Sequence, residues 1–389
     1  MRERWILWGA SLSPYALKLD AMLRRSGVDF MWRPAGGGRL ENLRLGWRLE
    51  RLRAGRLTID YPPMSELDEL PQVPFLLSND GRNLYDSSAL ATWIDERSPH
   101  TQPLVPAEPL ARFVARLIDE YFDEFGLYMA HHNRWVTSAR TNDAGHRLSG
   151  EFGFVWAGPQ RSFGSRWFSA RQVRRLPYLF SVAPQTPDFD DLPPALRPPA
   201  REGFPPTHEL LDRSFLRMLE RMELVLSDRP YLLGDRFTVA DASAFGQLDM
   251  NLSDPTANEI IEVRAPLTHA WIRRIEDGRF EERPVPDEAL ELGGRLGGLL
   301  EEIGRVFVPL MRQNEAAYER EVASGAPPDS SYYNESAFDA GRALYDGEID
   351  GTPFRAVVKT FQVAVWRGVC AQWRALDPDK RRDLPISLD

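Results

Sequence analysis

Residues 70–96 constrain the fold of this chain more than any other stretch, because their pattern predicts strand, hairpin, strand and helix in close succession. Residues 73–77 and 83–85 are short apolar runs, and the link between them contains Asn-Asp-Gly, which tolerates the backbone of a tight turn. Asp86 and Ser87 then precede an apolar helical pattern and offer side-chain oxygens to the free N–H groups of a helix start. Such a helix start also favours anions.

Pro74 has no N–H to donate to a sheet, which places it at a sheet edge, at a strand start or after a cis peptide bond. With Val73-Pro74 before the strand and Asp86-Ser87 before the helix, the stretch resembles the glutathione-binding half of the glutathione S-transferase family. In that family the residue before the cis proline binds the cysteinyl backbone of glutathione, and the acidic-serine pair holds the γ-glutamyl end. The resemblance implies these roles here, although the residues alone also fit a plain hairpin followed by a capped helix.

The first 98 residues follow the order of a thioredoxin-like α/β domain. A strand at 5–8, a helix from Pro14 to about Gly27 and a strand at 28–32 precede the hairpin. The connection after the second strand is long and contains an amphipathic segment at 40–57. Its arginines either meet an acidic group of a substrate or form a solvated helix face; they are Arg44, Arg48, Arg51, Arg53 and Arg56.

An all-helical domain is predicted over 107–308, after a proline-rich linker. It begins with an amphipathic helix at 110–129, continues through an irregular insertion at 137–206, and returns to helix at 207–227. Thr238 and Asp241 then form a reciprocal helix cap before a helix of small apolar residues. This is a second resemblance to the same family, whose central helix carries such a cap for folding rather than for chemistry.

A helical extension is predicted over 309–389, which smaller members of that family lack. It contains a helix at about 312–322, a Gly-Glu-Ile-Asp-Gly turn and a strongly apolar helix at 355–376. So many large apolar side chains must be covered by the rest of the protein. They either complete the core or a dimer interface, or they shape a substrate pocket.

Composition narrows the class of protein. The formal charge of −9 and the pI near 5.4 disfavour nucleic acid as a partner. The single cysteine, Cys370, excludes an internal disulfide and fits a reducing compartment. The absence of a long apolar run predicts no membrane segment. We therefore expect a cytoplasmic protein.

Ser13 is the candidate catalytic residue. A thiol is activated by a donor close to its sulfur, and Ser13-Pro14-Tyr15 matches the Ser-Pro-Phe/Tyr of serine-type members of the family, where the serine hydroxyl donates to the sulfur. The helix that begins at Pro14 adds its dipole to the same stabilisation. Ser11 and Tyr15 are alternatives, and Ser13 is equally explained as a helix N-cap. Without a cysteine in this loop, dithiol and mixed-disulfide chemistry are not expected.

Other candidate sites are weaker. His131 and His132 are adjacent on a helix and lack further ligands at metal spacing, so no metal is expected. Cys370 lies among apolar residues, as a buried small hydrophobe does. An aromatic cluster in the insertion either lines an apolar pocket or forms local core; it consists of Trp135, Phe152, Phe154, Trp156, Phe163, Trp167 and Phe168.

The resemblance implies a glutathione-dependent transferase or lyase, with glutathione as co-substrate and an apolar electrophile as second substrate. It also implies a homodimer. A non-catalytic protein that binds glutathione or a partner protein through the same fold is the alternative, because fold and activity are separate claims.

Overall fold

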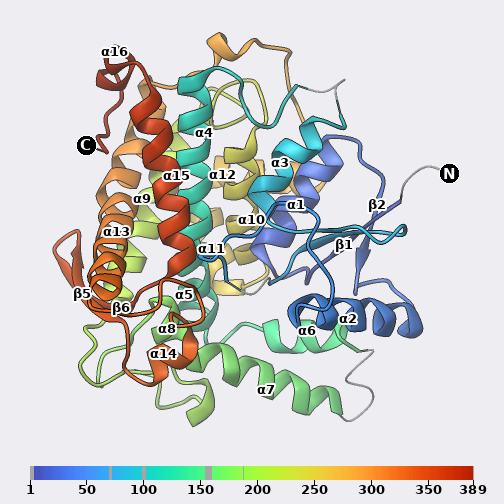
Figure 1. The fold of residues 1–389 in the computed structure, drawn as a ribbon, viewed down its shortest axis with the longest axis vertical. Coiled ribbons are helices and arrows are strands. Elements are labelled where there is room, and N and C mark those ends of the chain that lie inside the picture. The colour runs from blue at the N-terminus through green and yellow to red at the C-terminus, as the bar shows by residue number, and fades with distance from the viewer. Residues whose placement is uncertain (1–3, 70–71, 99–101, 154–159, 187, 389) are drawn as a thin grey trace.

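The computed structural model describes residues 4–69, 72–98, 102–153, 160–186 and 188–388 (Figure 1). Its N-terminal part contains a four-stranded sheet of order β2-β1-β3-β4. The strands are β1 (Trp5–Trp8), β2 (Phe30–Arg33), β3 (Phe75–Ser78) and β4 (Asn83–Leu84). β1 pairs in parallel with β2 and antiparallel with β3. The predicted thioredoxin-like order is therefore confirmed.

Helices cover both faces of this sheet (Figure 1). They are α1 (Pro14–Arg25), α2 (Arg39–Arg53) and α3 (Ser87–Asp95). Successive side chains of a strand point to opposite faces, so a strand buried on both sides is apolar throughout. In β1, the Trp5 ring meets the Trp93 ring of α3 at 4.8 Å, whereas Ile6 and Trp8 pack with the leucines of α2. α2 therefore covers the face of the sheet opposite α3.

The helical domain is built on one long helix. α4 (Pro109–Tyr121) continues through a π-helical turn (Phe122–Gly126) into α5 (Leu127–His132) and a second π-helical turn (Asn133–Thr137). The predicted helix at 110–129 is present and extends further. α10 (Val239–Leu252) lies in the middle of the molecule and contacts both α1 and α4. The remaining helices of this region are α9 (His208–Leu226), α11 (Pro255–Arg264) and α12 (Pro266–Glu276).

The start of α10 has the geometry of the predicted cap. The Asp241 carboxylate accepts hydrogen bonds from the Thr238 N–H at 2.9 Å, the Thr238 hydroxyl at 3.0 Å and the Leu232 N–H at 2.8 Å. Both side chains are fully buried, and burial raises the pKa of Asp241 to about 7. The carboxylate thus satisfies backbone donors that would otherwise be buried without a partner.

The insertion is more regular than predicted. The expectation of an irregular segment at 137–206 is wrong for its first half, which contains α6 (Ala144–Glu151), α7 (Gln160–Arg174) and α8 (Leu176–Leu179). A 3₁₀ turn (Pro194–Leu196) follows. Gly145 of α6 is a packing residue, because a β-carbon on it would collide with the Ser165 carbonyl of α7. Close helix contact, rather than turn formation, explains this glycine.

A single helix crosses the predicted boundary at 308/309. After two 3₁₀ turns (Asp287–Ala289 and Gly294–Leu296), α13 runs from Gly297 to Ala323 and contains Pro309. Proline inside a helix costs about 3 kcal/mol. The buried face continues on both sides of it, from Ile303 and Val306 to Leu310 and Met311. Burial of this apolar face offsets the missing hydrogen bond. The expectation of a separate helix at 312–322 is therefore wrong, because these residues belong to α13.

The extension also contains a hairpin that the sequence interpretation missed. β5 (Leu344–Ile349) and β6 (Thr352–Val357) pair antiparallel around Asp350 and Gly351, which both have positive φ, at 50° and 72°. Asp-Gly is a preferred pair for such a two-residue turn. The last long helix, α15 (Thr360–Ala375), therefore begins five residues later than predicted. Short helices precede and follow these elements: α14 (Glu335–Asp339) and α16 (Pro378–Arg382).

α15 packs along α4 and α13 (Figure 1). Trp366 and Trp373 of α15 are each 2% exposed. Their rings meet Phe307 of α13 at 6.2 Å and Phe113 of α4 at 5.3 Å, respectively. The extension is therefore part of the main core. None of the helices in the described residues has the length and hydropathy that a membrane crossing requires.

Replacing Trp366 by alanine tests this role of α15. We expect Trp366→Ala to lower the free energy of unfolding by about 3–5 kcal/mol, because it leaves a cavity between two packed helices. Trp47→Ala is the matched control, since Trp47 of α2 is 66% exposed and its loss is expected to cost less than about 1 kcal/mol. Urea unfolding followed by circular dichroism measures both. Equal effects of the two substitutions would contradict a core role for α15.

Candidate functional site

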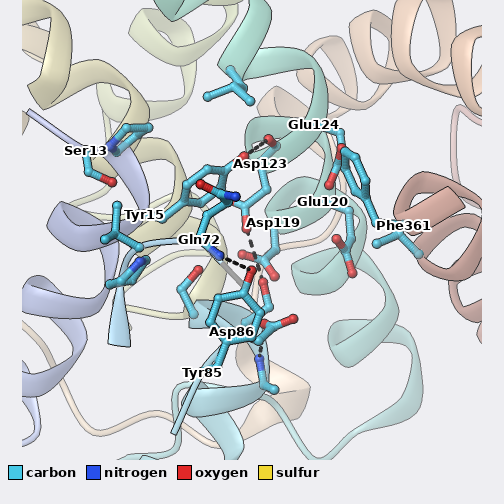
Figure 2. Close-up of a pocket in the computed structure, with 18 of the residues that line it drawn as sticks. Ser13, Tyr15, Gln72, Tyr85, Asp86, Asp119, Glu120, Asp123, Glu124 and Phe361 are labelled. Atoms are coloured by element: carbon cyan, nitrogen blue, oxygen red, sulfur yellow. Dashed lines mark hydrogen bonds between the residues drawn. The ribbon is translucent and has the colours of Figure 1, made fainter. Parts of the chain in front are cut away.

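A cavity of about 1160 Å³ lies where the N-terminal domain meets the helical domain. Its walls come from the loop before α1, the start of α3, the long helix α4–α5, the insertion and α15. Figure 2 shows Ser13 on one side and Phe361 of α15 on the other, with four carboxylates of the long helix also facing the pocket. The cavity is thus built from segments at both ends of the chain.

The structure brings most of the predicted site residues together. Ser13, Tyr15, Val73, Pro74, Asp86 and Ser87 all line this cavity. The Val73-Pro74 bond is cis, as considered from the sequence. Ser11 is the exception, because it does not line the cavity.

The Ser13 hydroxyl is available to a ligand. Ser13 is the N-cap residue of α1, and its carbonyl accepts from the Ala16 and Leu17 N–H groups at 3.0 Å each. Its side chain, however, makes no capping hydrogen bond. Within the described residues the hydroxyl has no protein partner, so the interpretation of Ser13 as a side-chain cap does not account for it.

Both alternatives to Ser13 are engaged with protein groups. Ser11 donates its hydroxyl to the Glu151 carboxylate of α6, and its N–H donates to the same carboxylate at 2.9 Å. Tyr15 donates its hydroxyl to the Asp123 carbonyl at 2.7 Å. Burial, followed by the charges of Glu124 and Asp123, raises the pKa of Tyr15 well above its usual value. Of these three hydroxyls, only that of Ser13 is free to donate into the cavity.

Asp86 and Ser87 form the start of α3. Asp86 has a φ of 66°, and its carboxylate accepts from the Ala89 N–H at 2.9 Å. One carboxylate oxygen therefore caps the helix, while the exposed residue still lines the cavity. Ser87 is buried at the first helical position, where backbone N–H groups have no partner within the helix. The pair can bind an ammonium group and a carboxylate side by side.

A row of carboxylates on the long helix was not predicted. Asp119 and Asp123 hold the buried Lys18 of α1 at 2.6 Å and 2.7 Å. Lys18 also donates to the Ser88 hydroxyl at 2.7 Å. These contacts join the start of α3, α1 and the long helix in one buried network, which fixes the wall of the cavity opposite α15.

Glu120 and Glu124 face the cavity beside this network (Figure 2). Glu120 accepts from Arg116 at 3.2 Å, and Glu124 accepts from the Gln362 amide of α15 at 3.0 Å. Burial raises the pKa of each carboxyl to about 8; the charge of Asp119 adds to the effect at Glu120. Both groups are therefore largely protonated at neutral pH and can donate hydrogen bonds.

Lys359 is a second functional group that the sequence interpretation missed. It precedes α15, is 4% exposed and lines the cavity with Tyr128 and Tyr178. Burial lowers its pKa to about 8. Lys18, Lys359 and Lys380 are the only lysines among 48 basic residues; Lys359 lines the cavity, whereas Lys18 is paired with Asp119 and Asp123 behind the wall that these two carboxylates form. The rarity of lysine was the available signal.

The arginines at 44–56 and the aromatic cluster do not come together in the cavity as two complete groups. None of the five arginines at 44–56 lines the cavity; Arg48 instead holds the sheet through the Asn83 side chain at 2.8 Å. Trp135 and Phe168 of the aromatic cluster line it, whereas Phe163 and Trp167 are exposed. Phe154 and Trp156 lie outside the described residues.

His131, His132 and Cys370 do not lie together in one binding site. His131 lines the cavity, while His132 is buried beside His208 with ring centroids 5.1 Å apart. Among the described residues, no three His, Cys, Asp or Glu side chains are placed to hold a metal ion. Cys370 is partly exposed rather than fully buried.

Comparisons with known proteins agree with this architecture. Residues 205–274 match the family model described as glutathione S-transferase, C-terminal domain. Glutathione S-transferase U19 of Arabidopsis thaliana is 20% identical over 298 residues, which are 76% of this chain and 94% of that protein.

Solved structures of low identity also match. Rice GST1, solved in complex with glutathione, is 17% identical with a TM-score of 0.36, over 74% of this chain and 93% of its own. The β-etherase LigF of Sphingobium sp. strain SYK-6 is 17% identical with a TM-score of 0.42, over 73% and 98%.

The raised pKa values of Glu120 and Glu124 predict a pH dependence of stability. Because their pKa values rise from about 4.3 in the unfolded chain to about 8 in the folded protein, the folded state binds more protons between these values. Their contribution to stability is present at low pH and is lost as pH rises towards 8. We expect the melting temperature to fall between about pH 5.5 and pH 8.

The double variant Glu120→Gln/Glu124→Gln should flatten this slope, because glutamine mimics the protonated acid at every pH. Glu209→Gln is the control, since the Glu209 side chain is 95% exposed and should leave the slope unchanged. Thermal melts across this pH range provide the measurement. An unchanged slope in the double variant would show that these two carboxyls are not the groups that titrate.

Proposed function

The chain belongs to the glutathione S-transferase family, and we propose that it is a glutathione-dependent transferase or lyase that uses the cavity described above. The free Ser13 hydroxyl, which lines the same cavity as Val73, Asp86 and Ser87, is the observation that carries this proposal. Glutathione is the co-substrate, and the second substrate is an electrophile that occupies the part of the cavity towards α15. The electrophile was expected to be apolar.

The cavity residues suit the chemical groups of glutathione. Asp86 has a carboxylate oxygen left for the γ-glutamyl ammonium group, and the start of α3 at Ser87 offers N–H donors to its carboxylate. The backbone of Val73, before the cis proline, is assigned the cysteinyl backbone. These contacts direct the thiol towards the loop that carries Ser13.

Ser13 then stabilises the thiolate over the thiol. Its hydroxyl donates a hydrogen bond to the sulfur, and the N-terminus of α1 adds about 0.3–1 kcal/mol through its dipole. Both interactions favour the charged form, so they lower the pKa of the thiol and raise the concentration of the nucleophile at neutral pH. A carbon–sulfur bond forms at the electrophilic carbon as the leaving group departs with its electron pair.

Homodimer assembly remains a prediction from the family resemblance, and a cytoplasmic location remains a prediction from the composition. The electrophile is addressed further below.

Binding of glutathione should raise the melting temperature. A ligand at a hundred times its dissociation constant stabilises a one-site protein by about 2.7 kcal/mol. Asp86→Asn should reduce this shift, because asparagine retains a cap acceptor and tolerates positive φ but loses the charge that binds the ammonium group. Differential scanning fluorimetry with millimolar glutathione measures the effect. A folded wild-type protein whose melting temperature does not change would contradict the proposal.

Ser13→Ala should reduce turnover more than binding. A hydrogen bond to a charged acceptor is worth about 1.5–3 kcal/mol, so we expect kcat/KM with 1-chloro-2,4-dinitrobenzene to fall roughly 10- to 100-fold at neutral pH. The deficit should shrink as pH rises, because the thiol then ionises without help. Ser11→Ala should show neither effect.

Three results would lead to other conclusions. A pH-independent deficit in Ser13→Ala, equal to its loss of glutathione affinity, would indicate a binding residue. Unchanged turnover would remove Ser13 from the mechanism. Glutathione binding without turnover of any electrophile in the wild-type protein would favour the alternative of a non-catalytic glutathione-binding protein.

A further inference from the structure

Lys359 occupies a fixed position at the wall of the cavity. Its N–H donates to the Asn314 side-chain oxygen, and its carbonyl accepts from the Asn314 amide, both at 2.9 Å. Asn314 belongs to α13 and is 1% exposed. This two-bond clamp holds the backbone of Lys359 at the junction of β6 and α15, so the ammonium group is preorganised rather than mobile.

One hydrogen of the Lys359 ammonium group has no protein acceptor. The Nζ atom donates to the Tyr128 hydroxyl at 2.6 Å and to the Leu179 carbonyl at 3.1 Å. It also lies 4.4 Å from the centre of the Tyr128 ring and 5.4 Å from that of Tyr178. An ammonium group has three donors. Within the described residues, the third donor remains for a ligand.

The charge of Lys359 is also unpaired. Two other cationic side chains near the cavity are equally buried, and both are neutralised: Lys18, which lies behind the wall, by Asp119 at 2.6 Å, and Arg134, which lines the cavity, by Asp254 at 2.8 Å. Among the described residues, Lys359 makes no direct ion pair with a carboxylate; Glu69 and Glu124 attract it only through longer-range electrostatics. A buried charge without a counter-charge is costly, so such a cation in a binding cavity indicates an anionic ligand.

The nearby charged side chains do not supply the missing partner. Glu69 and Glu124 act on Lys359 only from a distance, and Arg175 has the same sign of charge. Glu124 accepts from Gln362, and its raised pKa leaves it largely protonated at neutral pH. Arg175 is paired with Glu335 at 2.8 Å. An external anion would supply the direct ion pair that these residues do not form with Lys359.

Tyr178 supplies a second donor next to Lys359. Its ring is 8% exposed, it lines the cavity, and its hydroxyl makes no hydrogen bond to any described residue. Burial raises its pKa, so the hydroxyl keeps its proton. One ammonium hydrogen and one phenol hydrogen match the two oxygens of a carboxylate, whereas a phosphate dianion needs more donors.

We propose that Lys359 and Tyr178 bind a carboxylate of the second substrate, so that the electrophile is an aromatic or aliphatic carboxylic acid rather than a purely apolar molecule. The apolar body of such a substrate would contact Trp135, Leu148 and Phe168, which line the same cavity. This inference rests on the proposed function, because it names the class of substrate that reacts beside Ser13.

Three glutathione conjugates test the proposal without requiring turnover. S-(4-carboxy-2-nitrophenyl)glutathione carries the carboxylate, S-(4-carbamoyl-2-nitrophenyl)glutathione is its uncharged analogue, and S-methylglutathione occupies only the glutathione part of the site. Isothermal titration calorimetry of the wild-type protein should show the carboxylate conjugate binding at least about tenfold more tightly than the carboxamide, a difference of about 1.4 kcal/mol.

Variants of Lys359 then test whether this residue causes the preference for the carboxylate conjugate over the carboxamide. Lys359→Gln should abolish it and leave the affinity for S-methylglutathione unchanged, while Lys359→Arg should retain part of it. Lys380→Gln is the matched control, because Lys380 is the exposed lysine of the chain and is paired with Glu108 at 2.6 Å. It should leave all three affinities unchanged. Melting temperatures of the variants show whether each is folded.

Each outcome is decisive. Equal binding of the carboxylate and carboxamide conjugates by the wild-type protein overturns the proposal, and this comparison needs no variant. A loss of S-methylglutathione affinity in Lys359→Gln, with the preference intact, would show that Lys359 binds a carboxylate of glutathione itself and would also overturn it. Failure of all three ligands to bind would contradict the proposed function, and this inference with it.

Discussion

The buried ion network around Lys18 determines how the two parts of the site face each other. Lys18 of α1 is held by Asp119 and Asp123 of the long helix, and Asp123 also accepts from the Ser243 hydroxyl of α10 at 2.8 Å. Breaking a buried pair by removing one partner typically costs about 3–5 kcal/mol, because the other charge is left uncompensated. A rotation of α1 against α4 would break these bonds, so the network fixes the loop of Ser13 relative to the opposite wall.

Gly246 shows how closely the same helices approach. A β-carbon on this residue of α10 would collide with the Pro14 carbonyl at the start of α1. The N-terminus of α1 is thus held by ion pairs on one side and by direct backbone contact on another. The position of Ser13 follows from packing between domains rather than from its own loop, although the loop sequence is what identified it.

Local patterns predicted the parts of the structure that depend on local physics. Val73-Pro74, Asp86-Ser87 and the Thr238–Asp241 cap are short motifs whose geometry is set by neighbouring residues. The helix through Pro309 and the helical insertion could not be predicted in this way, because contacts with distant segments outweigh unfavourable local propensity. The role of Lys359 could not be predicted from local sequence either, because nothing near it in the chain indicates that Tyr128 and Tyr178 will surround it. The sequence showed only that lysine is rare in this arginine-rich chain.

The contribution of α15 to the cavity has a consequence for how the site is assembled in time. A ribosome produces the thioredoxin-like domain before the helical domain, and domains generally begin to fold in that order during synthesis. Phe361 and Lys359 leave the ribosome long after Ser13 and Asp86, so a nascent chain carries Ser13 and Asp86 on a surface that lacks one wall. The apolar side of α4 that meets Trp373 also stays uncovered until then. Completion of the site and protection of the core against aggregation are therefore the same late event in biosynthesis.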